Sequence, residues 1–181
     1  MKKLMLSLSF LLVTGILMSQ KLTTTSAVVS FDATTEKDLL PKAENKTVIG
    51  SLDKTTGALA FEAAVNNFAF SNPLMQQHFN SDRWLNSAAF PKFSFSGKLN
   101  KLNTVKFNKN GTYKTTVTGN LTVKGVTKPI SAPVTISVLN GKVSGTSAFS
   151  ITLADFGIAG QTQIASGKVA QVVKINVVAG F

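Results

Sequence analysis

Cysteine is absent from the sequence of 181 residues, and its absence excludes several kinds of chemistry. Without a thiol, the chain has no cysteine nucleophile, no thiolate metal ligand and no disulfide bond. A protein of this composition that works outside the cytoplasm must therefore be held together by packing and hydrogen bonds.

Histidine is almost absent, because His78 is the only one. A metal site would need further histidines or clustered carboxylates, and the sequence groups none, so we expect no metal. A Ser-His-Asp triad would have to use His78, and no nucleophile-elbow motif accompanies it. Asp82 and Asp155 could form an acid pair only if the fold joined them, and turn roles suit both residues better. We therefore expect no catalytic residue, no cofactor and no enzymatic activity.

Acidic residues are also scarce, with 8 Asp and Glu against 19 Lys and Arg, which gives a net charge of +11. The imbalance lies in the later part of the chain, where Asp82 and Asp155 are the only acids after residue 63. A basic surface attracts anionic lipid or nucleic acid. Because the lysines are scattered and form no tight run, we expect no nucleic-acid partner and only transient contact with anionic membrane.

The first residues have the pattern of a secretory signal peptide. Two lysines precede an apolar run from Leu4 to about Met18, and Ser19 is a small residue at a plausible cleavage point. A membrane anchor is the alternative, but the run is shorter than the roughly 20 residues that a span needs. We predict a signal peptide at residues 1–19 and a periplasmic domain at residues 20–181.

Alternation of apolar and polar residues dominates the rest of the sequence. This period of two is typical of strands with one buried face, and short turns between them favour an antiparallel sheet. A closed barrel removes the exposed edges of such a sheet. We therefore predict an all-β fold, an eight-stranded antiparallel barrel, with strands near residues 27–34, 46–53, 57–70, 92–99, 112–123, 127–138, 142–153 and 169–179.

One segment between the third and fourth predicted strands has a different pattern. Residues 71–88 carry Ser71 or Asn72 as a helix cap and Pro73 in the first turn. The spacing predicts a short helix, with a second turn carrying Trp84. A helix inserted at this point would plug or cover one mouth of the barrel.

Alternation alone does not decide which face of the barrel is apolar. An apolar exterior would give a small outer-membrane barrel, and the terminal Phe181 fits that alternative. Tyr and Trp, which form the aromatic girdles of such barrels, occur only once each, while the 13 Phe lie largely within strands. An apolar interior would be either a filled core or a ligand cavity. Small residues at inward positions favour the cavity: Ala63, Gly97, Gly119, Ala132 and Gly145.

Three segments carry a resemblance to a known family: HFNSDRWLNSAAFPKFSFSGKL at 78–99, GNLTVKGVTKPISAPVTI at 119–136 and DFGI at 155–158. They resemble the YceI-like family of periplasmic polyisoprenoid-binding proteins, and the closer likeness is to its divergent members of the Bacteroidetes type. The resemblance implies a lipocalin-like barrel with a helix near its opening, an elongated lipid pocket and a homodimer. Two features depart from the family pattern: no Arg shortly precedes Asp155, and the first strand lacks an Asp-x-x-His-Ser start.

The resemblance and the alternation together predict an exported protein that holds a long apolar chain for transport or sequestration. The ligand would be a polyisoprenoid, an isoprenoid quinone or a fatty acyl lipid. An outer-membrane barrel and a ligand-free structural or stress-related barrel are the alternatives. The predicted ligand contacts are Phe31, Phe61, Val65, Phe79, Trp84, Leu85, Phe90, Phe93, Phe95, Phe149, Ile151 and Phe156.

Overall fold

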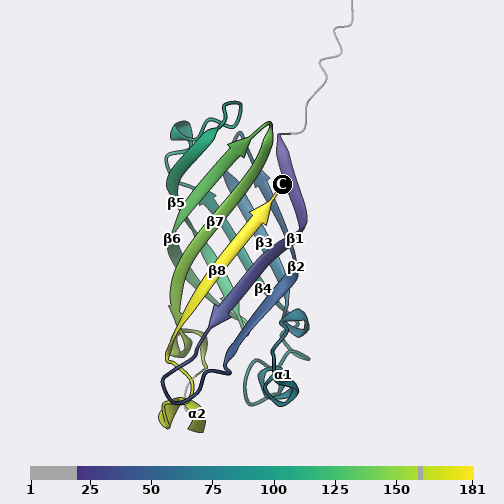
Figure 1. The fold of residues 1–181 in the computed structure, drawn as a ribbon, viewed down its shortest axis with the longest axis vertical. Helices are drawn as coiled ribbons and strands as arrows, with labels where there is room; N and C mark the ends of the chain where they lie inside the picture. Colours follow the sequence, from purple (N-terminus) through teal and green to yellow (C-terminus); the bar gives the residue numbers. More distant parts are fainter. Residues whose placement is uncertain (1–19, 159–160) are drawn as a thin grey trace, which may run out of the picture.

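Eight antiparallel strands close into one barrel in sequence order, and β8 pairs with β1 to complete it (Figure 1). The structure is a computed structural model that describes residues 20–158 and 161–181, so the predicted signal peptide lies outside the described residues. The strands are β1 (Lys21–Asp32), β2 (Lys42–Asp53), β3 (Ala58–Ala64), β4 (Lys92–Leu99), β5 (Gly111–Val123), β6 (Val126–Leu139), β7 (Lys142–Thr152) and β8 (Val172–Gly180).

The predicted fold class is confirmed, since the structure is an eight-stranded antiparallel, lipocalin-like barrel with its helical insert between β3 and β4. Several strand boundaries differ from the prediction, and the two largest differences are at the start of β1 and the end of β3. β1 begins at Lys21, well before residue 27, and pairs with the far part of β2. β3 ends at Ala64, because the chain turns there into a 3₁₀ turn, η1 (Val65–Asn67).

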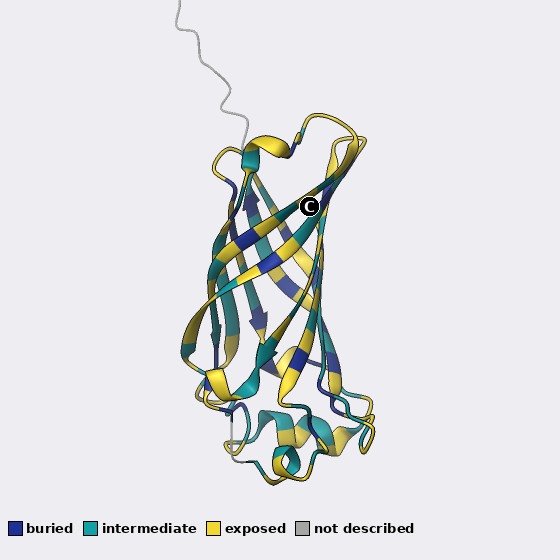
Figure 2. Ribbon diagram, turned by 90° about the vertical axis from the view of Figure 1, so that its left-hand side faces the viewer, coloured by how far each residue is buried: buried dark blue, intermediate teal, exposed yellow. Residues whose placement is uncertain are grey.

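Apolar side chains face the inside of the barrel, and polar side chains face outward. Along the strands, buried or half-buried residues alternate with exposed ones, as Figure 2 shows. Lys92, Lys98 and Lys114, for example, are exposed, whereas Phe93 and Leu99 belong to the core. This arrangement is the reverse of the outer-membrane alternative, whose lipid-facing band would need apolar outward residues.

The two ends of the barrel are built differently. At one end, the β4–β5 connection contains the 3₁₀ turn η2 (Leu102–Thr104), and it packs Leu102, Val105 and Phe107 against the core. We call this the closed end. At the other end lie α1 (Pro73–Asn80), the 3₁₀ turn η3 (Leu153–Phe156) and α2 (Thr162–Ala165) (Figure 1). We call this the mouth.

The helix α1 begins as the sequence predicts. The Asn72 side chain accepts hydrogen bonds from the amides of Leu74, at 2.8 Å, and Met75, at 3.4 Å, and Pro73 is the first helical residue. Its Ser81 cap is followed by a hydrogen-bonded turn that carries Trp84, also as predicted. Neither α-helix in the described residues has the length and apolar content needed to cross a membrane.

Candidate ligand-binding site

The barrel contains two adjoining apolar cavities. The mouth cavity measures about 150 Å³ and the inner cavity about 160 Å³. Four residues line both of them: Phe93, Val123, Ile151 and Ile175. Because these four residues belong to both linings, the two cavities adjoin one another inside the barrel, and we refer to them together as the passage.

Glycines in the wall make room for the aromatic rings of the inner cavity. A Cβ atom added to Gly50 would lie 2.3 Å from Cε1 of Phe61, and one added to Gly97 would lie 2.5 Å from Cζ of Phe95. The same Phe95 ring also lies over Gly119, where an added Cβ would be 2.7 Å away. The rings therefore lie against the barrel wall. Rings that pointed toward the barrel axis would fill the interior, whereas these rings line it.

The last residue of the chain lies at the inner cavity. Phe181 is one of its lining residues, and its ring centroid is 6.5 Å from that of Phe61. The Phe181 amide donates a hydrogen bond to the carbonyl of Val143 at 2.9 Å, which anchors the end of the chain. The terminal phenylalanine thus belongs to the apolar interior.

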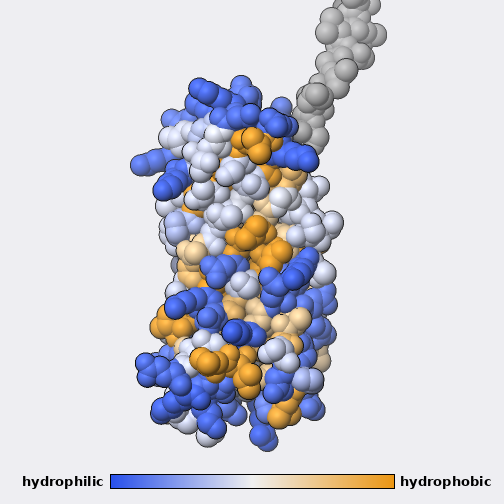
Figure 3. All heavy atoms as spheres, in the orientation of Figure 1, coloured by the Kyte–Doolittle hydropathy of each residue, from blue (hydrophilic) through white to orange (hydrophobic). Residues whose placement is uncertain are grey.

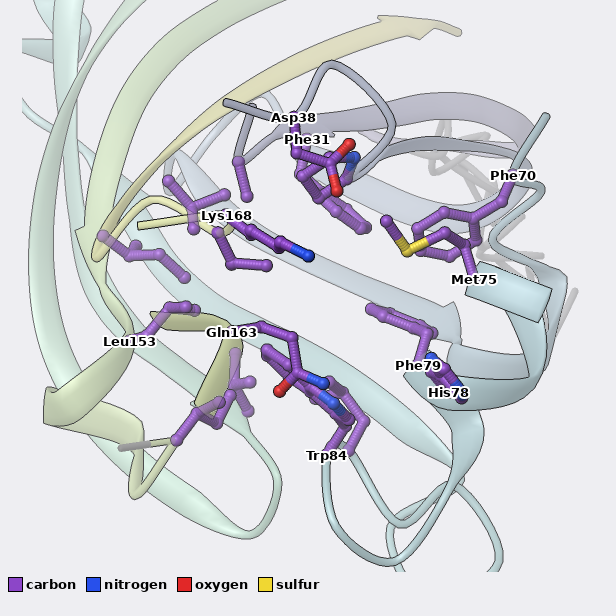
Figure 4. A pocket seen from close by; sticks show the side chains of 18 of the residues that line it. Phe31, Asp38, Phe70, Met75, His78, Phe79, Trp84, Leu153, Gln163 and Lys168 are labelled. Atoms are coloured by element: carbon purple, nitrogen blue, oxygen red, sulfur yellow. The ribbon is translucent and has the colours of Figure 1, made fainter. Parts of the chain in front are cut away.

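A group of stacked phenylalanines joins α1 to the barrel at the mouth. The rings of Phe31 and Phe79 are stacked, with centroids 5.5 Å apart and planes at 17°. Phe79 also lies 5.1 Å from Phe70 and 5.9 Å from the buried Phe68. Figure 4 shows Phe79 on α1 facing the cavity, with Phe31 and Phe70 beside it. The helix therefore packs over the mouth chiefly through the ring of Phe79, and two further α1 side chains also line the cavity.

A small polar group lies on the rim of the mouth cavity. It consists of Asp38 from the β1–β2 loop, His78 from α1, and Gln163 and Lys168 from the segment around α2 (Figure 4). Two hydrogen bonds tie the β1–β2 loop to that segment: Thr35 Oγ1 donates to the Gly167 carbonyl at 2.8 Å, and Lys37 Nζ donates to the Ser166 carbonyl at 3.0 Å.

Nine of the twelve predicted contact residues line the passage. Trp84 and Leu85 belong to the mouth cavity with Phe31 and Phe79, while Phe149 belongs to the inner cavity with Phe61 and Phe95. Phe93 and Ile151 line both. Whether these side chains contact a ligand stays a prediction.

Three of the predicted contact residues line neither cavity. Val65 and Phe156, which are 0% and 2% exposed, pack in one buried cluster behind the mouth. The Phe90 ring lies against Gly125 in the β5–β6 turn, where an added Cβ would be 2.6 Å from Cε1. The alternation placed Val65 on a continued third strand, but the chain turns into η1 there and carries the side chain into the core. The structure therefore gives these three residues packing roles.

Several lining residues were not predicted as contacts. Phe70 and Met75 flank the start of α1, and the sequence offered no reason to bring them beside the β1–β2 loop. Gln163 lies in the four-residue α2 and Lys168 in the turn after it, and this segment of the sequence has no periodicity. By contrast, Val173 and Ile175 follow the apolar–polar alternation of β8, and this pattern could have predicted them as ligand contacts.

Two carboxylates outside the cavities, those of Asp32 and Asp53, have hydrogen-bond partners in the chain. The pKa of Asp32 is lowered by hydrogen bonds from the Thr34 hydroxyl and amide, and that of Asp53 by the amides of Thr56 and Thr55. Within residues 20–158 and 161–181, no group of three or more His, Asp or Glu side chains is arranged to hold a metal ion.

Comparison with known families decides what kind of barrel this is. A family model described as the YceI-like domain matches residues 17–181. The chain belongs to the YceI-like family. Comparison with curated protein sequences gave no match.

Solved structures share the YceI-like fold at low sequence identity. A polyisoprenoid binding domain from Saccharophagus degradans, described as implicated in plant cell wall breakdown, superimposes with a TM-score of 0.75. Its identity is 12%, over 90% of this chain and 98% of that one. BcnA of Burkholderia cenocepacia gives a TM-score of 0.71 and 17% identity, over 86% and 96% of the chains. The Campylobacter jejuni YCEI protein gives a TM-score of 0.56 and 20% identity, over 75% of this chain and 80% of that one.

Proposed function

We propose that this YceI-like protein holds one long apolar chain in its barrel, for transport or sequestration, and catalyses no reaction. The observation that carries the proposal is the passage formed by the two adjoining cavities, whose walls are almost entirely apolar. The printed name of the Saccharophagus degradans domain, which shares this fold, supports a polyisoprenoid as one candidate ligand. An isoprenoid quinone and a fatty acyl lipid fit the same wall chemistry.

Apolar burial alone supplies enough free energy for useful affinity. Removing apolar surface from water gains roughly 25 cal/mol per Å², or about 0.8 kcal/mol per buried methylene group. A chain that occupies both cavities would therefore bind without a strong polar contact. Its length and shape, more than its hydrogen bonds, would set the selectivity of the barrel.

We further propose that the protein is exported to the periplasm. The support is the charged and apolar pattern of residues 1–19. Amino-terminal sequencing of protein recovered from the periplasm would test the predicted cleavage after Ser19. A chain that retains Met1 and stays in the membrane fraction would favour the anchor alternative.

The first experiment is native mass spectrometry of protein purified from the periplasm without detergent, followed by identification of any released molecule. A stoichiometric adduct with the mass of a prenyl or acyl lipid is the expected result. A clean mass of the protein alone, with no uptake of added prenyl or acyl lipid, would favour the ligand-free structural barrel.

A binding titration then locates the site, because Trp84 lines the mouth cavity and is the only tryptophan. We expect farnesol or a long-chain fatty acid to change its fluorescence in a saturable way. Phe93→Asp places a charge where the two cavities meet and should abolish binding, since an unpaired charge in an apolar site is strongly unfavourable. Ser96→Asp is the matched control, because Ser96 lies on the same strand and is exposed. Equal affinity in both variants would overturn the proposed site.

The expected partners beyond the ligand are also proposals. Transient contact with anionic membrane is supported by the net positive charge of the chain. A homodimer is supported by the exposed Val178 on the outer face of β8, which pairs across strands with Val28, and Figure 3 shows an apolar patch on this face of the barrel. Sedimentation of the purified protein, with and without Val178→Lys, would test the dimer.

A further inference from the structure

One member of the polar group on the rim of the mouth cavity is a cation whose side chain extends over the largely apolar cavity. Figure 4 shows the Lys168 side chain extending from the segment after α2 toward the centre of the cavity, with Gln163 below it. Among the described residues, the Lys168 ammonium takes part in no hydrogen bond or ion pair. A lysine that points into an apolar cavity without a partner is available for a polar group of the ligand.

The backbone holds Lys168 and Gln163 together. The Lys168 amide donates to the Gln163 carbonyl at 2.8 Å, and the Val169 amide donates to the same carbonyl at 3.0 Å. The turn itself is attached to the β1–β2 loop through Lys37 and Thr35, which hold the carbonyls of Ser166 and Gly167. The two side chains therefore project from one hydrogen-bonded turn, at a fixed place on the rim.

No charged group on the rim within the described residues forms an ion pair with Lys168. The Asp38 carboxylate accepts a hydrogen bond from the Leu40 amide at 2.8 Å and forms no ion pair with Lys168, although its loop lies beside the turn that carries Lys168 (Figure 4). The Lys37 ammonium donates a hydrogen bond to the Ser166 carbonyl. His78 lies across the cavity on α1. Lys168 is thus the cation that an entering headgroup meets on the side of α2.

We propose that the ligand carries an anionic headgroup, a carboxylate or a phosphate, which the Lys168 ammonium and the Gln163 amide bind at the mouth while the tail occupies the passage. This inference rests on the proposed function and narrows it from any apolar chain to an acid-headed lipid. Ammonium-to-oxyanion hydrogen bonds are stronger than those between neutral groups. The exposed position of Lys168 keeps the gain moderate, because solvent screens the pair.

The test compares ligands that differ only in the headgroup, with Trp84 fluorescence as the signal. Palmitic acid and hexadecanol form one pair, and farnesyl phosphate and farnesol form the other. In the unaltered protein, we expect the acid-headed ligand of at least one pair to bind roughly fivefold more tightly than its neutral partner. The pair that shows the preference identifies the headgroup as a carboxylate or a phosphate. The preference should fall with added salt.

Lys168→Gln should abolish this preference and leave the affinity for the neutral ligands unchanged. Lys124→Gln is the matched control: it removes the same charge from the β5–β6 turn at the mouth, outside the lining of either cavity. The headgroup proposal would be overturned if the preference for the acid-headed ligand remained in Lys168→Gln. It would also be overturned if Lys124→Gln removed that preference to the same degree. Equal binding of acid and neutral ligands would also overturn it. Failure of all four ligands to bind would instead contradict the proposed function.

Discussion

Phenylalanine and glycine lie opposite one another in the wall of this barrel, and the pairing keeps the interior open. Gly50 pairs with Phe61 across β2 and β3, and Phe61 pairs with Phe95 across β3 and β4. The Phe95 ring in turn lies over Gly97 and Gly119. Each ring lies over a glycine, which has no side chain. The rings therefore line the inner cavity with aromatic surface and take up little of its volume.

Gly50→Ala tests this arrangement at a single residue. The three atoms nearest to an added Cβ all belong to the Phe61 ring, so we expect this ring to rotate toward the inner cavity. We expect the affinity for long-chain ligands to fall, while short ligands that fill only the mouth cavity bind as before. Overpacking should also lower the free energy of unfolding by about 1–3 kcal/mol. Binding titrations across a series of chain lengths, with urea unfolding, measure both effects.

Gly180→Ala is the control for this experiment, because an added Cβ there meets no atom within 4 Å. If Gly50→Ala weakens short and long ligands to the same degree, the two cavities do not act as consecutive sections. If it weakens neither, Phe61 does not limit the inner cavity.

Asp32 gives the stability of the barrel a dependence on pH. Its pKa is lowered chiefly by the Thr34 hydroxyl, which donates to it at 2.6 Å, and next by the Thr34 amide at 2.9 Å. A lowered folded-state pKa means that the stabilisation is complete above the unfolded-state value, about 3.9, and is lost as the pH falls through the folded-state value. Asp32→Asn should therefore be less stable than the unaltered protein at pH 7, and the difference should shrink below about pH 4.

Urea unfolding at pH 7 and pH 3 checks this prediction. Asp53, whose pKa is also lowered, is present in both proteins, so the comparison isolates Asp32. A difference in unfolding free energy that is the same at both pH values would show that the carboxylate charge is not what stabilises the end of β1.

Among the elements, α1 is held to the barrel by few contacts. None of its residues is fully buried, and Phe79 supplies its stacking contact with Phe31. The Asn72 cap closes its first turn. An element with so little buried surface can open without unfolding the strands beneath it. We therefore regard α1 as the part of the mouth that moves when a ligand enters.

Asn72→Ala should loosen α1 and leave the barrel intact. Loss of a helix cap costs about 1 kcal/mol, so local opening should become roughly fivefold more frequent. We expect faster hydrogen exchange within residues 74–80 and faster release of bound lipid, with little change in global stability. Asn100→Ala is the control, because it removes side-chain hydrogen bonds to Thr116 and Thr118 near the closed end. Equal release rates in the two variants would contradict a gating role for α1.

The strands and α1 could be predicted because each has a local pattern in the sequence. The start of β1 was missed because KLTTTS contains little apolar alternation, and its pairing with β2 sets its conformation. The four-residue α2 (Thr162–Ala165) has no cap interaction from a side chain and was also missed. Lys168 and Asp38 reach one rim only through the closure of the barrel, which joins segments far apart in sequence. Such contacts between loops leave no local signal.

At the scale of the whole molecule, the positive charge is concentrated away from the mouth. Within the described residues, the connecting segments at the mouth carry as many acidic as basic side chains. The closed end and the adjoining ends of its strands carry one acid, Asp53, and these lysines: Lys21, Lys54, Lys98, Lys101, Lys106, Lys109, Lys114 and Lys142. The net charge of the chain is thus distributed as a basic end and a nearly neutral mouth.

This distribution predicts how the protein would lie on an anionic membrane. Each lysine near such a surface contributes roughly 1 kcal/mol, so the closed end should contact the bilayer and the mouth should point away. Binding to vesicles that contain phosphatidylglycerol should weaken by at least about 30-fold in the double variant Lys54→Glu with Lys109→Glu. The unaltered protein should also lose binding as salt rises, because the contacts are electrostatic.

The matched control changes the same charge at the mouth through Lys124→Glu with Lys128→Glu. If the closed end is the contact surface, this second variant should keep most of its vesicle binding, since its substituted residues lie a barrel length from the bilayer. Equal losses in the two variants would mean that net charge, without orientation, governs membrane contact. A greater loss in the mouth variant would reverse the orientation and place the opening of the lipid passage against the bilayer.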